Sequence, residues 1–492
     1  MNRKKDIAIV FDCGATNVRV VAMHTSGVIL AKHSMPNEID KDPYLPGGQI
    51  WKIESLWAKL CIASKIVVSK IDASRIAGVT VTTFGVDGTL VDAKGNPLYP
   101  VISWQCKRTH PVAENIENYI PLKKLYEISG VFPYAFNTIN KLIWFKENKT
   151  KLLVKANRFL FISSLFIHKL TGTLKNDITM LGTSMTADLK HRKVSKKILS
   201  TVGLDPELFG EIVETGTMAG EINKKAMQET GIPKGTHVFF TGHDTQFAIL
   251  GSGASLNQPV LSSGTWEILM ARIESFNATE RELENNITTE ADSVAGIFNI
   301  GQNWLASGIL EWFSSNFYSE LQGEELFTTM IKEAEFVEPM SHGLTINPAF
   351  YTENANQNSG SIKGLTIQTS RSQIYRALLE SLAFRLREGL ESLQAAGNFK
   401  AESLICVGGG SRNELWNQIR ADVCKLPVHT IKQKETTVLG AAIIVFVGAK
   451  IFNSIDEARD QVDYSPSIVF PANDSQKYET AYQNYLQFKK QG

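Results

Sequence analysis

The pattern of apolar and polar positions divides the start of the chain into short strands separated by a polar turn. Residues 7–11 form a continuous apolar run, which is typical of a buried strand, and residues 18–23 predict a second strand. Residues 12–17, Asp-Cys-Gly-Ala-Thr-Asn, lie between them and predict a turn. Two strands joined by such a turn predict a hairpin whose backbone N–H groups and hydroxyls can surround a phosphate.

A similar pattern recurs near the middle of the chain. Residues 260–270 again predict a strand, a turn with Gly264 and Thr265, and a second strand. Two phosphate-type hairpins about 250 residues apart suggest duplicated halves that face one another. Chance similarity between two strand turns is the alternative.

A third strand and turn lie between the two hairpins. Residues 238–240 predict an apolar strand, and Thr-Gly-His-Asp connects it to a helix over residues 245–250. A carboxylate at a strand-to-helix turn can face a ligand while the sheet fixes its backbone, so Asp244 is a candidate catalytic residue. The alternative is that Asp244 only caps the helix, because Asp is a favoured N-cap residue.

Two further residues of the first half suggest carbohydrate binding. Residues 76–83 predict a strand that leads into Asp87, whose carboxylate could accept hydrogen bonds from sugar hydroxyls. Trp104 has polar neighbours, and an apolar aromatic face beside polar donors is the combination used in carbohydrate stacking. An ordinary turn aspartate before Gly88 and a buried structural tryptophan are the alternatives.

The second half predicts a ligand-binding loop between a strand and a helix. Residues 403–407 predict a buried strand, and residues 408–413, Gly-Gly-Gly-Ser-Arg-Asn, lead into a helix over residues 414–425. Glycines at this position let a ligand approach the positive N-terminus of the helix. A dinucleotide-binding turn is the rival, but its glycine spacing is broken at Asn413.

Helical periodicity and turn residues predict several other elements. Three stretches predict helices, namely residues 159–170, 304–313 and 374–394. Residues 354–360 are rich in Asn, Ser and Gly and predict a loop. A glycine-bearing helix at residues 440–447 could pack closely against the helix at 245–250.

Composition restricts the class of protein. A chain of 492 residues is too long for a single hydrophobic core. Because 51 Lys and Arg are balanced by 50 Asp and Glu, the chain has no excess of positive charge that would attract nucleic acid. Five scattered cysteines without a Cys-x-x-Cys pair argue for a reducing compartment and against a disulfide frame or a zinc site. The apolar run at residues 7–11 is too short for a signal peptide, and the one at residues 438–449 is too short to span a membrane. We therefore expect a cytoplasmic protein that binds neither membrane nor nucleic acid.

These segments together resemble the FGGY family of carbohydrate kinases, within the actin, hexokinase and Hsp70-like ATPase superfamily. The resemblance extends over residues 7–452, and residues 406–428 are similar to the specific C-terminal signature of the family. It implies an α/β fold with two ribonuclease-H-like domains around a central cleft. The implied domains are residues 1–247, which bind the sugar, and 248–492, which bind the nucleotide. The implied protein is a monomer or a homodimer whose ligands are ATP and a small sugar.

The resemblance also assigns roles to the candidate residues. Asp244 would be the general base that takes the proton from the sugar 1-hydroxyl and would contact the sugar, and Asp12 would hold the waters of Mg²⁺. Asp87 and Trp104 would bind the sugar. The residues implied to line the phosphates and the adenosine are Gly14, Ala15, Thr16, Asn17, Gly264, Thr265, Gly409, Gly410 and Asn413. His243 is the competing base, because imidazole titrates near neutrality.

Within the family, the closest similarity is to kinases of L-fuculose. Residues 11–19, 81–88, 242–248, 261–270 and 301–308 support this interpretation. Xylulokinases carry a different motif at residues 84–88, and glycerol kinases have an Asp where this chain has Cys106. A kinase of L-rhamnulose is the nearest rival, because Gly-Val-Asp at residues 85–87 is similar there too. A nucleotide switch of the actin or Hsp70 type, without sugar chemistry, is the non-enzymatic alternative.

Overall fold

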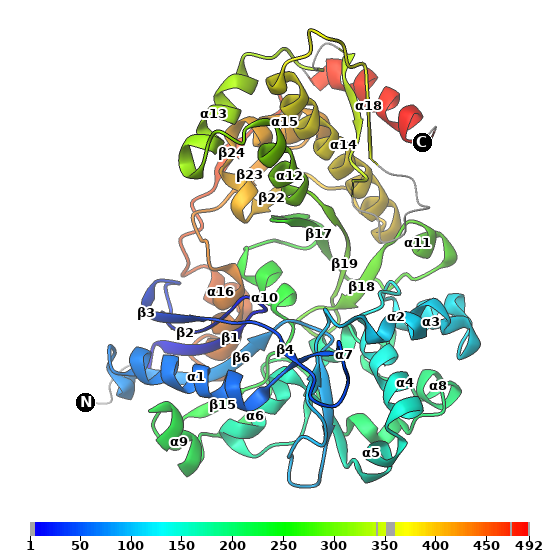
Figure 1. Cartoon of the computed structure of the whole chain (residues 1–492). Helices are drawn as coiled ribbons and strands as arrows, with labels where there is room; N and C mark the ends of the chain where they lie inside the picture. The colour runs from blue at the N-terminus through cyan, green and yellow to red at the C-terminus, as the bar shows by residue number, and fades with distance from the viewer. Residues whose placement is uncertain (1–4, 341–342, 351–359, 473–474, 491–492) are drawn as a thin grey trace. The chain divides into compact units, whose positions relative to one another are not determined.

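The computed structural model describes residues 5–340, 343–350, 360–472 and 475–490 (Figure 1). The described residues form two compact units, each assembled from segments that are distant in the sequence. The first unit takes its residues from Met1–Gly253, Ile273–Asn299 and Glu435–Asp463, and the second from Ala254–Arg272, Ile300–Lys434 and Tyr464–Gly492. Apart from Gly360, the loop expected at residues 354–360 lies outside the described residues.

The first unit is built on a six-stranded sheet with the order β14-β15-β6-β1-β2-β3. Strands β1, β2 and β3 form an antiparallel meander, and β6 and β15 continue the sheet in parallel with β1. Every residue of β1 and β6 is buried, as expected for parallel strands covered on both faces. The strand bounds are β1 Ile7–Cys13, β2 Asn17–His24, β3 Ile29–Pro36, β6 Ile76–Thr83, β14 Met218–Glu221 and β15 His237–Phe239.

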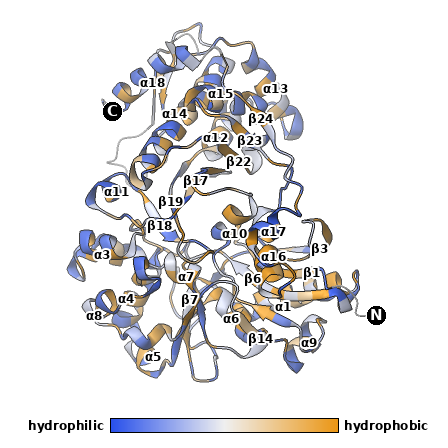
Figure 2. Cartoon of the chain, turned by 180° about the vertical axis from the view of Figure 1, so that it is seen from behind, coloured by the Kyte–Doolittle hydropathy of each residue, from blue (hydrophilic) through white to orange (hydrophobic). Residues whose placement is uncertain are grey.

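Two glycine-bearing helices of this unit pack closely, as the sequence predicts. They are α10 (Asp244–Gly251) and α16 (Thr436–Gly448). A Cβ at Gly251 would clash with the carbonyl oxygen of Thr436, and a Cβ at Gly440 would clash with that of Phe247. Figure 2 shows α16 almost entirely hydrophobic, and it packs on β1 and β6. The backbone of α10 is therefore held against the core of the unit.

The first unit has further helices and strands outside this six-stranded sheet. The helices are α1 Ile53–Val68, α2 His110–Glu114, α3 Leu122–Ser129, α4 Thr138–Asn148, α5 Thr150–Lys155, α6 Ile162–Thr171, α7 Ile178–Gly182, α8 Lys196–Thr201, α9 Lys224–Thr230, α11 Glu280–Glu284 and α17 Ile455–Arg459. The strands are β4 Asp40–Lys41, β5 Gln49–Trp51, β7 Gly88–Val91, β8 Val101–Ile102, β9 Arg158–Phe161, β10 Asn176–Asp177, β11 Ala187–Asp188, β12 Lys193–Val194, β13 Ile212–Val213 and β18 Thr288–Ala291.

The second unit repeats the strand arrangement of the first. Its strands follow the order β19-β17-β16-β22-β23-β24. The hairpin β16–β17 is antiparallel, and β22 and β23 continue in parallel with β16, as β6 and β15 do with β1. The predicted duplication of α/β halves is therefore confirmed. The bounds are β16 Val260–Ser263, β17 Trp266–Ile273, β19 Phe298–Leu305, β22 Leu404–Val407, β23 Val428–Thr430 and β24 Ser467–Val469.

The helices of the second unit include the two that the sequence predicts around the glycine-rich loop. The long helix α14 (Arg371–Gly397) begins with a capping box between Ser370 and Gln373, and α15 (Glu414–Cys424) begins after Asn413. The other elements are α12 Ser307–Phe317, α13 Gly323–Glu335, α18 Ser475–Lys489, β20 Thr345–Asn347 and β21 Ser361–Lys363. No helix of the described residues is long and apolar enough to cross a membrane.

Two predicted helices begin too early. Residues 159–161 belong to strand β9, which pairs with β7, and the helix α6 begins only at Ile162. Likewise, Trp304 and Leu305 end strand β19, and α12 begins at Ser307. Both errors have the same cause, because a short apolar run can be a buried strand or a buried helix segment.

Candidate active site

Asp244 lies at the turn between strand β15 and helix α10. It is the first residue of the helix, and His243 occupies the N-cap position without capping it through its side chain. The Oδ1 atom of Asp244 accepts a hydrogen bond of 2.7 Å from the backbone N–H of Thr245. Its side chain is 31% exposed. Asp244 is therefore not the N-cap residue itself, although its carboxylate accepts a hydrogen bond within the first turn, and its catalytic role stays a prediction.

The surroundings of Asp244 make it a better base near neutral pH. Desolvation by the surrounding protein raises the pKa of Asp244 to about 6. The nearby charge of His243 opposes this shift, whereas the Asp12 carboxylate adds to it. A carboxylate with a pKa near 6 is largely ionised at pH 7 and still accepts a proton more readily than an ordinary aspartate.

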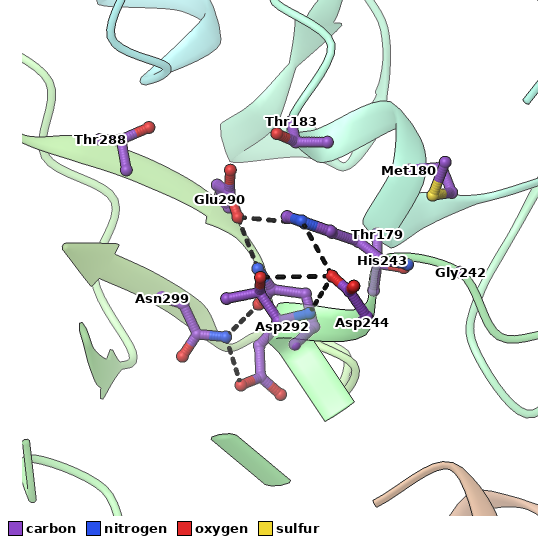
Figure 3. Close-up of polar contacts among 12 residues, drawn as sticks. Thr179, Met180, Thr183, Gly242, His243, Asp244, Thr288, Glu290, Asp292 and Asn299 are labelled. Carbon is purple, nitrogen blue, oxygen red and sulfur yellow. Dashed lines mark hydrogen bonds and ion pairs between the residues drawn. The ribbon is translucent and has the colours of Figure 1, made fainter. Parts of the chain in front are cut away.

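His243 lies between two carboxylates (Figure 3). Its Nε2 atom is 3.6 Å from Oδ1 of Asp244, and its Nδ1 atom is 3.4 Å from Oε2 of Glu290, a residue of strand β18. Burial alone would lower the pKa of His243, but the two carboxylates raise it above the ordinary value. The imidazole therefore carries positive charge more readily than an isolated histidine.

A buried polar network continues from Glu290 (Figure 3). The Nε2 atom of Gln246, on α10, donates a hydrogen bond of 2.5 Å to Oε2 of Glu290. Asn299 donates from Nδ2 to Oε1 of Gln246 and to Oδ2 of Asp292, the second at 2.9 Å. Because all these groups are buried, the network fixes the orientation of Glu290.

Asp12 lies on β1, in the same unit as Asp244. Its Oδ2 atom accepts a hydrogen bond of 2.6 Å from Nε of Arg19 on β2, and Nη1 of Arg19 donates at 2.6 Å to Oε2 of Glu435. Burial raises the pKa of Asp12, Arg19 opposes this, and Glu435 adds to it. The guanidinium of Arg19 thus lies between two carboxylates at the base of the first hairpin.

The turn of the first hairpin is short and partly exposed. The backbone N–H of Gly14 donates to the carbonyl of Asn17 at 2.9 Å, and Nδ2 of Asn37 donates to the carbonyl of Gly14 at 2.9 Å. Ala15 is half-buried, and Thr16 and Asn17 are exposed. The turn therefore presents backbone and hydroxyl groups beside Asp12, as a phosphate site requires.

A magnesium ion that arrives with a nucleotide fits the donors around Asp12. Within the described residues, no group of three or more His, Cys, Asp and Glu side chains could hold a metal ion. Mg²⁺ in phosphoryl-transfer enzymes keeps several waters and binds through one or two carboxylates together with phosphate oxygens. Asp12 supplies a suitable carboxylate, so the residues present suit a shared, hydrated ion rather than a metal cage made of protein.

Asp87 is fully buried, and its carboxylate has three donors. Its Oδ2 atom accepts hydrogen bonds from Nε1 of Trp51 at 2.7 Å and from the backbone N–H of Trp104 at 3.0 Å. Its Oδ1 atom pairs with Nζ of Lys141, which is also buried. These contacts tie the segment around Asp87 to that around Trp104. Direct contact between Asp87 and a sugar stays a prediction.

Trp104 lies at the edge of a half-buried aromatic group. Its side chain contacts Phe136 edge-on at 6.2 Å, and Phe136 stacks on Tyr134 at 4.9 Å between ring centroids. Trp104 is 37% exposed, so it is not a buried structural tryptophan. Its partly exposed indole ring could stack on the apolar face of a sugar.

The other predicted ligand residues belong to the second unit. The carbonyl of Gly264 accepts a hydrogen bond from the N–H of Ser307, and that of Thr265 accepts from Ala306 and Gly308, at 3.0–3.3 Å. The second hairpin is thereby fastened to the start of α12.

The predicted adenosine loop follows β22. A Cβ at Gly410 would clash with Oγ of Ser263, which keeps the loop close to the second hairpin. Among the described atoms, a Cβ at Gly409 would meet nothing within 4 Å, so this backbone is open to a ligand. Asn413 caps α15 by accepting the N–H of Trp416 at 3.0 Å.

A buried ion pair supports the second hairpin. The Nη2 atom of Arg420, on α15, donates to Oε1 of Glu267 at 2.5 Å and to Oγ of Ser263 at 2.7 Å. The other oxygen of Glu267 accepts from Nε1 of Trp304 at 2.9 Å. These contacts join β16, β17, β19 and α15, and three of these elements flank the predicted nucleotide residues Gly264, Thr265 and Asn413.

Sequence reasoning missed the partners of the predicted residues. Arg19, Lys141, Glu290 and Glu435 contact Asp12, Asp87 or His243, directly or through one another, but stand in no recognisable motif. Glu290 lies 46 positions after Asp244 within an ordinary strand. Arg19 offered the one usable signal, because it ends the Gly-Ala-Thr-Asn-Val-Arg stretch of the first hairpin.

Comparison with known proteins agrees with the fold. Residues 7–251 and 260–449 match the N-terminal and C-terminal domains of the FGGY family of carbohydrate kinases. The chain is 42% identical to the L-fuculokinase of Escherichia coli (strain K12) and 41% identical to that of Salmonella typhi, each over 97% of this chain and 99% of the relative. Its fold superposes on the xylulose kinase from Rhodospirillum rubrum with a TM-score of 0.89, at 20% identity over 98% of both chains.

The fold is therefore the mixed α/β two-domain fold of sugar kinases, of the actin and hexokinase type, and the predicted fold class is confirmed. The duplicated sheets and the carboxylate at the start of α10 agree with that class. The chain belongs to the FGGY family of carbohydrate kinases.

Proposed function

We propose that this protein transfers the γ-phosphoryl group of ATP to the 1-hydroxyl of L-fuculose and forms L-fuculose 1-phosphate in L-fucose degradation. The observation that supports this substrate best is the similarity to L-fuculokinases along nearly the whole of both chains. The half-exposed carboxylate of Asp244, with its raised pKa, supports the reaction type.

Asp244 acts as the general base. It takes the proton of the sugar 1-hydroxyl while that oxygen bonds to the γ-phosphorus. The bond from the γ-phosphorus to the bridging oxygen breaks, and ADP leaves. Phosphoryl transfer depends mainly on positioning and on neutralisation of charge, so the rigid attachment of α10 to the core matters as much as the basicity of Asp244.

The nucleotide binds to both hairpins and to the adenosine loop. In this proposal the phosphates contact Gly14, Ala15, Thr16, Asn17, Gly264 and Thr265, and the adenosine contacts Gly409, Gly410 and Asn413. Asp12 would hold the waters of Mg²⁺, and the ion would neutralise charge on the phosphates. In this proposal residues 1–247 form the sugar-binding domain and residues 248–492 the nucleotide-binding domain, although the first compact unit also takes in residues 273–299 and 435–463.

The sugar lies against the first unit. Trp104 stacks on the apolar face of the sugar. Together with Phe84, Trp104 also shelters the C6 methyl group. Asp87 contributes to the same sugar-binding site. The rings of Phe84 and Trp51 are in contact, with 4.9 Å between their centroids, which supports a preformed apolar wall of the sugar site. L-Rhamnulose is the second candidate substrate, because Gly-Val-Asp at residues 85–87 is similar in kinases of L-rhamnulose too. We also propose a cytoplasmic location, in line with five free cysteines.

A panel of four sugars tests the proposal. ATP consumption is measured with L-fuculose, L-rhamnulose, D-ribulose and D-xylulose, and the product is located by phosphorus NMR. The highest kcat/KM is expected for L-fuculose, with phosphate on the 1-oxygen. A higher kcat/KM for L-rhamnulose would assign the second candidate. ATP binding without turnover of any sugar would favour a nucleotide switch.

A further inference from the structure

Two side chains and a glycine from different parts of the first unit meet beside Asp244. His243 precedes the base in the chain, Glu290 comes from strand β18, and Gly85 follows strand β6. The His243 side chain is 13% exposed and the Glu290 side chain 8% exposed. Neither residue has a role in the transfer step proposed above, although the ring of His243 lies within 3.6 Å of the base.

The orientation of the imidazole is fixed from three sides. Glu290 faces Nδ1, Asp244 faces Nε2, and the ring lies so close to Gly85 that a Cβ there would come within 2.9 Å of Cδ2 and Nε2. The backbone N–H of His243 also donates to Oγ1 of Thr179 at 3.1 Å. A side chain at position 85 would push the imidazole ring of His243 away from this position.

Glu290 is itself held in place. Besides His243, its carboxylate accepts the hydrogen bond from Gln246, which Asn299 and Asp292 orient in turn (Figure 3). Burial alone would raise the pKa of Glu290, but His243 and its hydrogen-bond donors lower it. Glu290 is therefore an ionised carboxylate that stabilises a protonated His243.

We propose that Glu290 and His243 are positioning residues for the general base: Glu290 holds the imidazole in its cationic form against Gly85, and the imidazole orients the Asp244 carboxylate and keeps it ionised. The inference rests on the proposed function, in which Asp244 is the base. It assigns no proton transfer to His243, because the base already takes the proton of the sugar hydroxyl.

Other titratable groups lie near this pair. Asp12 on β1 raises the pKa of Asp244, and Asp177 lies next to Gly242 and accepts a hydrogen bond from Thr179. Cys13 is also close, but burial raises the pKa of its thiol above the working range. Helix α16, which packs on α10, contains no titratable side chain.

The test is the pH dependence of kcat at saturating L-fuculose and Mg²⁺·ATP. Activity should fall as the pH decreases through about 6 in the wild-type protein, because protonated Asp244 is not a base. An opposite charge at this distance lowers the pKa of an aspartate by about 1–3 units, so His243→Asn should move the acid limb upward by that amount. Glu290→Gln should move it in the same direction, because His243 then loses a carboxylate that raises its pKa and carries positive charge less readily.

The double variant separates this mechanism from a general loss of structure. If Glu290 acts through His243, then Glu290→Gln should shift the limb little further in a His243→Asn background. Asp177→Asn is the control, because burial also raises the pKa of Asp177 to about 6. If the acid limb reports Asp244 and not Asp177, it should stay in place in this variant. ATP affinity, measured by calorimetry, should be unchanged in each variant.

Two outcomes would overturn the inference: an acid limb that does not move in His243→Asn and Glu290→Gln, or shifts that simply add in the double variant. If Glu290→Gln does not fold, the limb of His243→Asn decides alone. Failure of the proposed function gives a different result, namely wild-type turnover in Asp244→Asn or no turnover of any sugar.

Discussion

The guanidinium of Arg19 connects Asp12 to Glu435, which lies 416 positions after Arg19 in the chain. Arg19 donates to both carboxylates at 2.6 Å, so the end of strand β1 is joined to the start of helix α16. The same helix packs against α10, which carries Asp244. The predicted metal carboxylate and the predicted base are thereby attached to one rigid core within the first unit.

The first prediction concerns the metal. Asp12→Asn keeps the shape of the side chain but removes its charge, so Mg²⁺ loses an anionic partner. We expect the half-saturating concentration of free Mg²⁺ to rise, while kcat recovers in part at high Mg²⁺. The measurement is turnover against free Mg²⁺ at fixed ATP. An unchanged Mg²⁺ requirement would remove Asp12 from the proposed metal site.

The second prediction concerns the nucleotide loop. Described atoms leave open space around a Cβ at Gly409, so Gly409→Leu should fold normally and obstruct only a bound ligand. We expect ATP affinity to fall in the order glycine, alanine, leucine, as measured by calorimetry. Thermal unfolding without ligand serves as the control and should be unchanged. Wild-type ATP affinity in Gly409→Leu would show that this loop does not meet the nucleotide.

The third prediction concerns the contact between α10 and α16. A methyl group at Gly440 would clash with the backbone of Phe247, which cannot move without shifting the helix. Gly440→Ala should lower the free energy of unfolding by about 1–3 kcal/mol, and kcat should fall because Asp244 moves with α10. Gly409→Ala is the matched control and should cost little stability. Equal denaturation midpoints for Gly440→Ala and wild type would refute this packing argument.

The fourth prediction concerns the methyl group of the sugar. One methyl group in an apolar pocket is worth about 1–3 kcal/mol, so L-fuculose should be preferred over a pentulose by roughly 10- to 200-fold in kcat/KM. Trp104→Ala should reduce that preference. Tyr44→Ala, which removes an exposed aromatic ring of the same unit, should not. Equal kcat/KM values of the wild-type protein for L-fuculose and D-xylulose would argue for a general pentulokinase.

The sequence predicts well those features that depend on local pattern. The hairpins, strand β6, the long helix α14 and the glycine contact between α10 and α16 are all visible as periodicity or as turn residues. Errors occur where local pattern is ambiguous. The apolar residues 159–161 could continue the following helix, but their pairing with Gly88–Val91 makes them a strand, and this pairing depends on a distant segment.

The candidate site is predictable only in part for the same reason. Asp12 and Asp244 stand beside recognisable turns, whereas some of the charges that tune them come from remote segments, namely Glu435 for Asp12 and Asp12 for Asp244. Glu290 lies in the strand Thr-Thr-Glu-Ala, which resembles any half-buried strand, and Lys141 lies in an ordinary helix. Only the folded chain brings these residues to His243 and Asp87.

The most direct test of the account is kcat of Asp244→Asn with saturating L-fuculose and Mg²⁺·ATP, measured beside His243→Asn at pH 8. Positioned general-base catalysis typically contributes about 10²- to 10⁴-fold, so Asp244→Asn should lose that factor in kcat while its ATP affinity stays nearly intact. His243→Asn should retain far more activity, because it keeps the base itself. Near wild-type kcat in Asp244→Asn, with turnover abolished in His243→Asn, would contradict the assignment of Asp244 as the base.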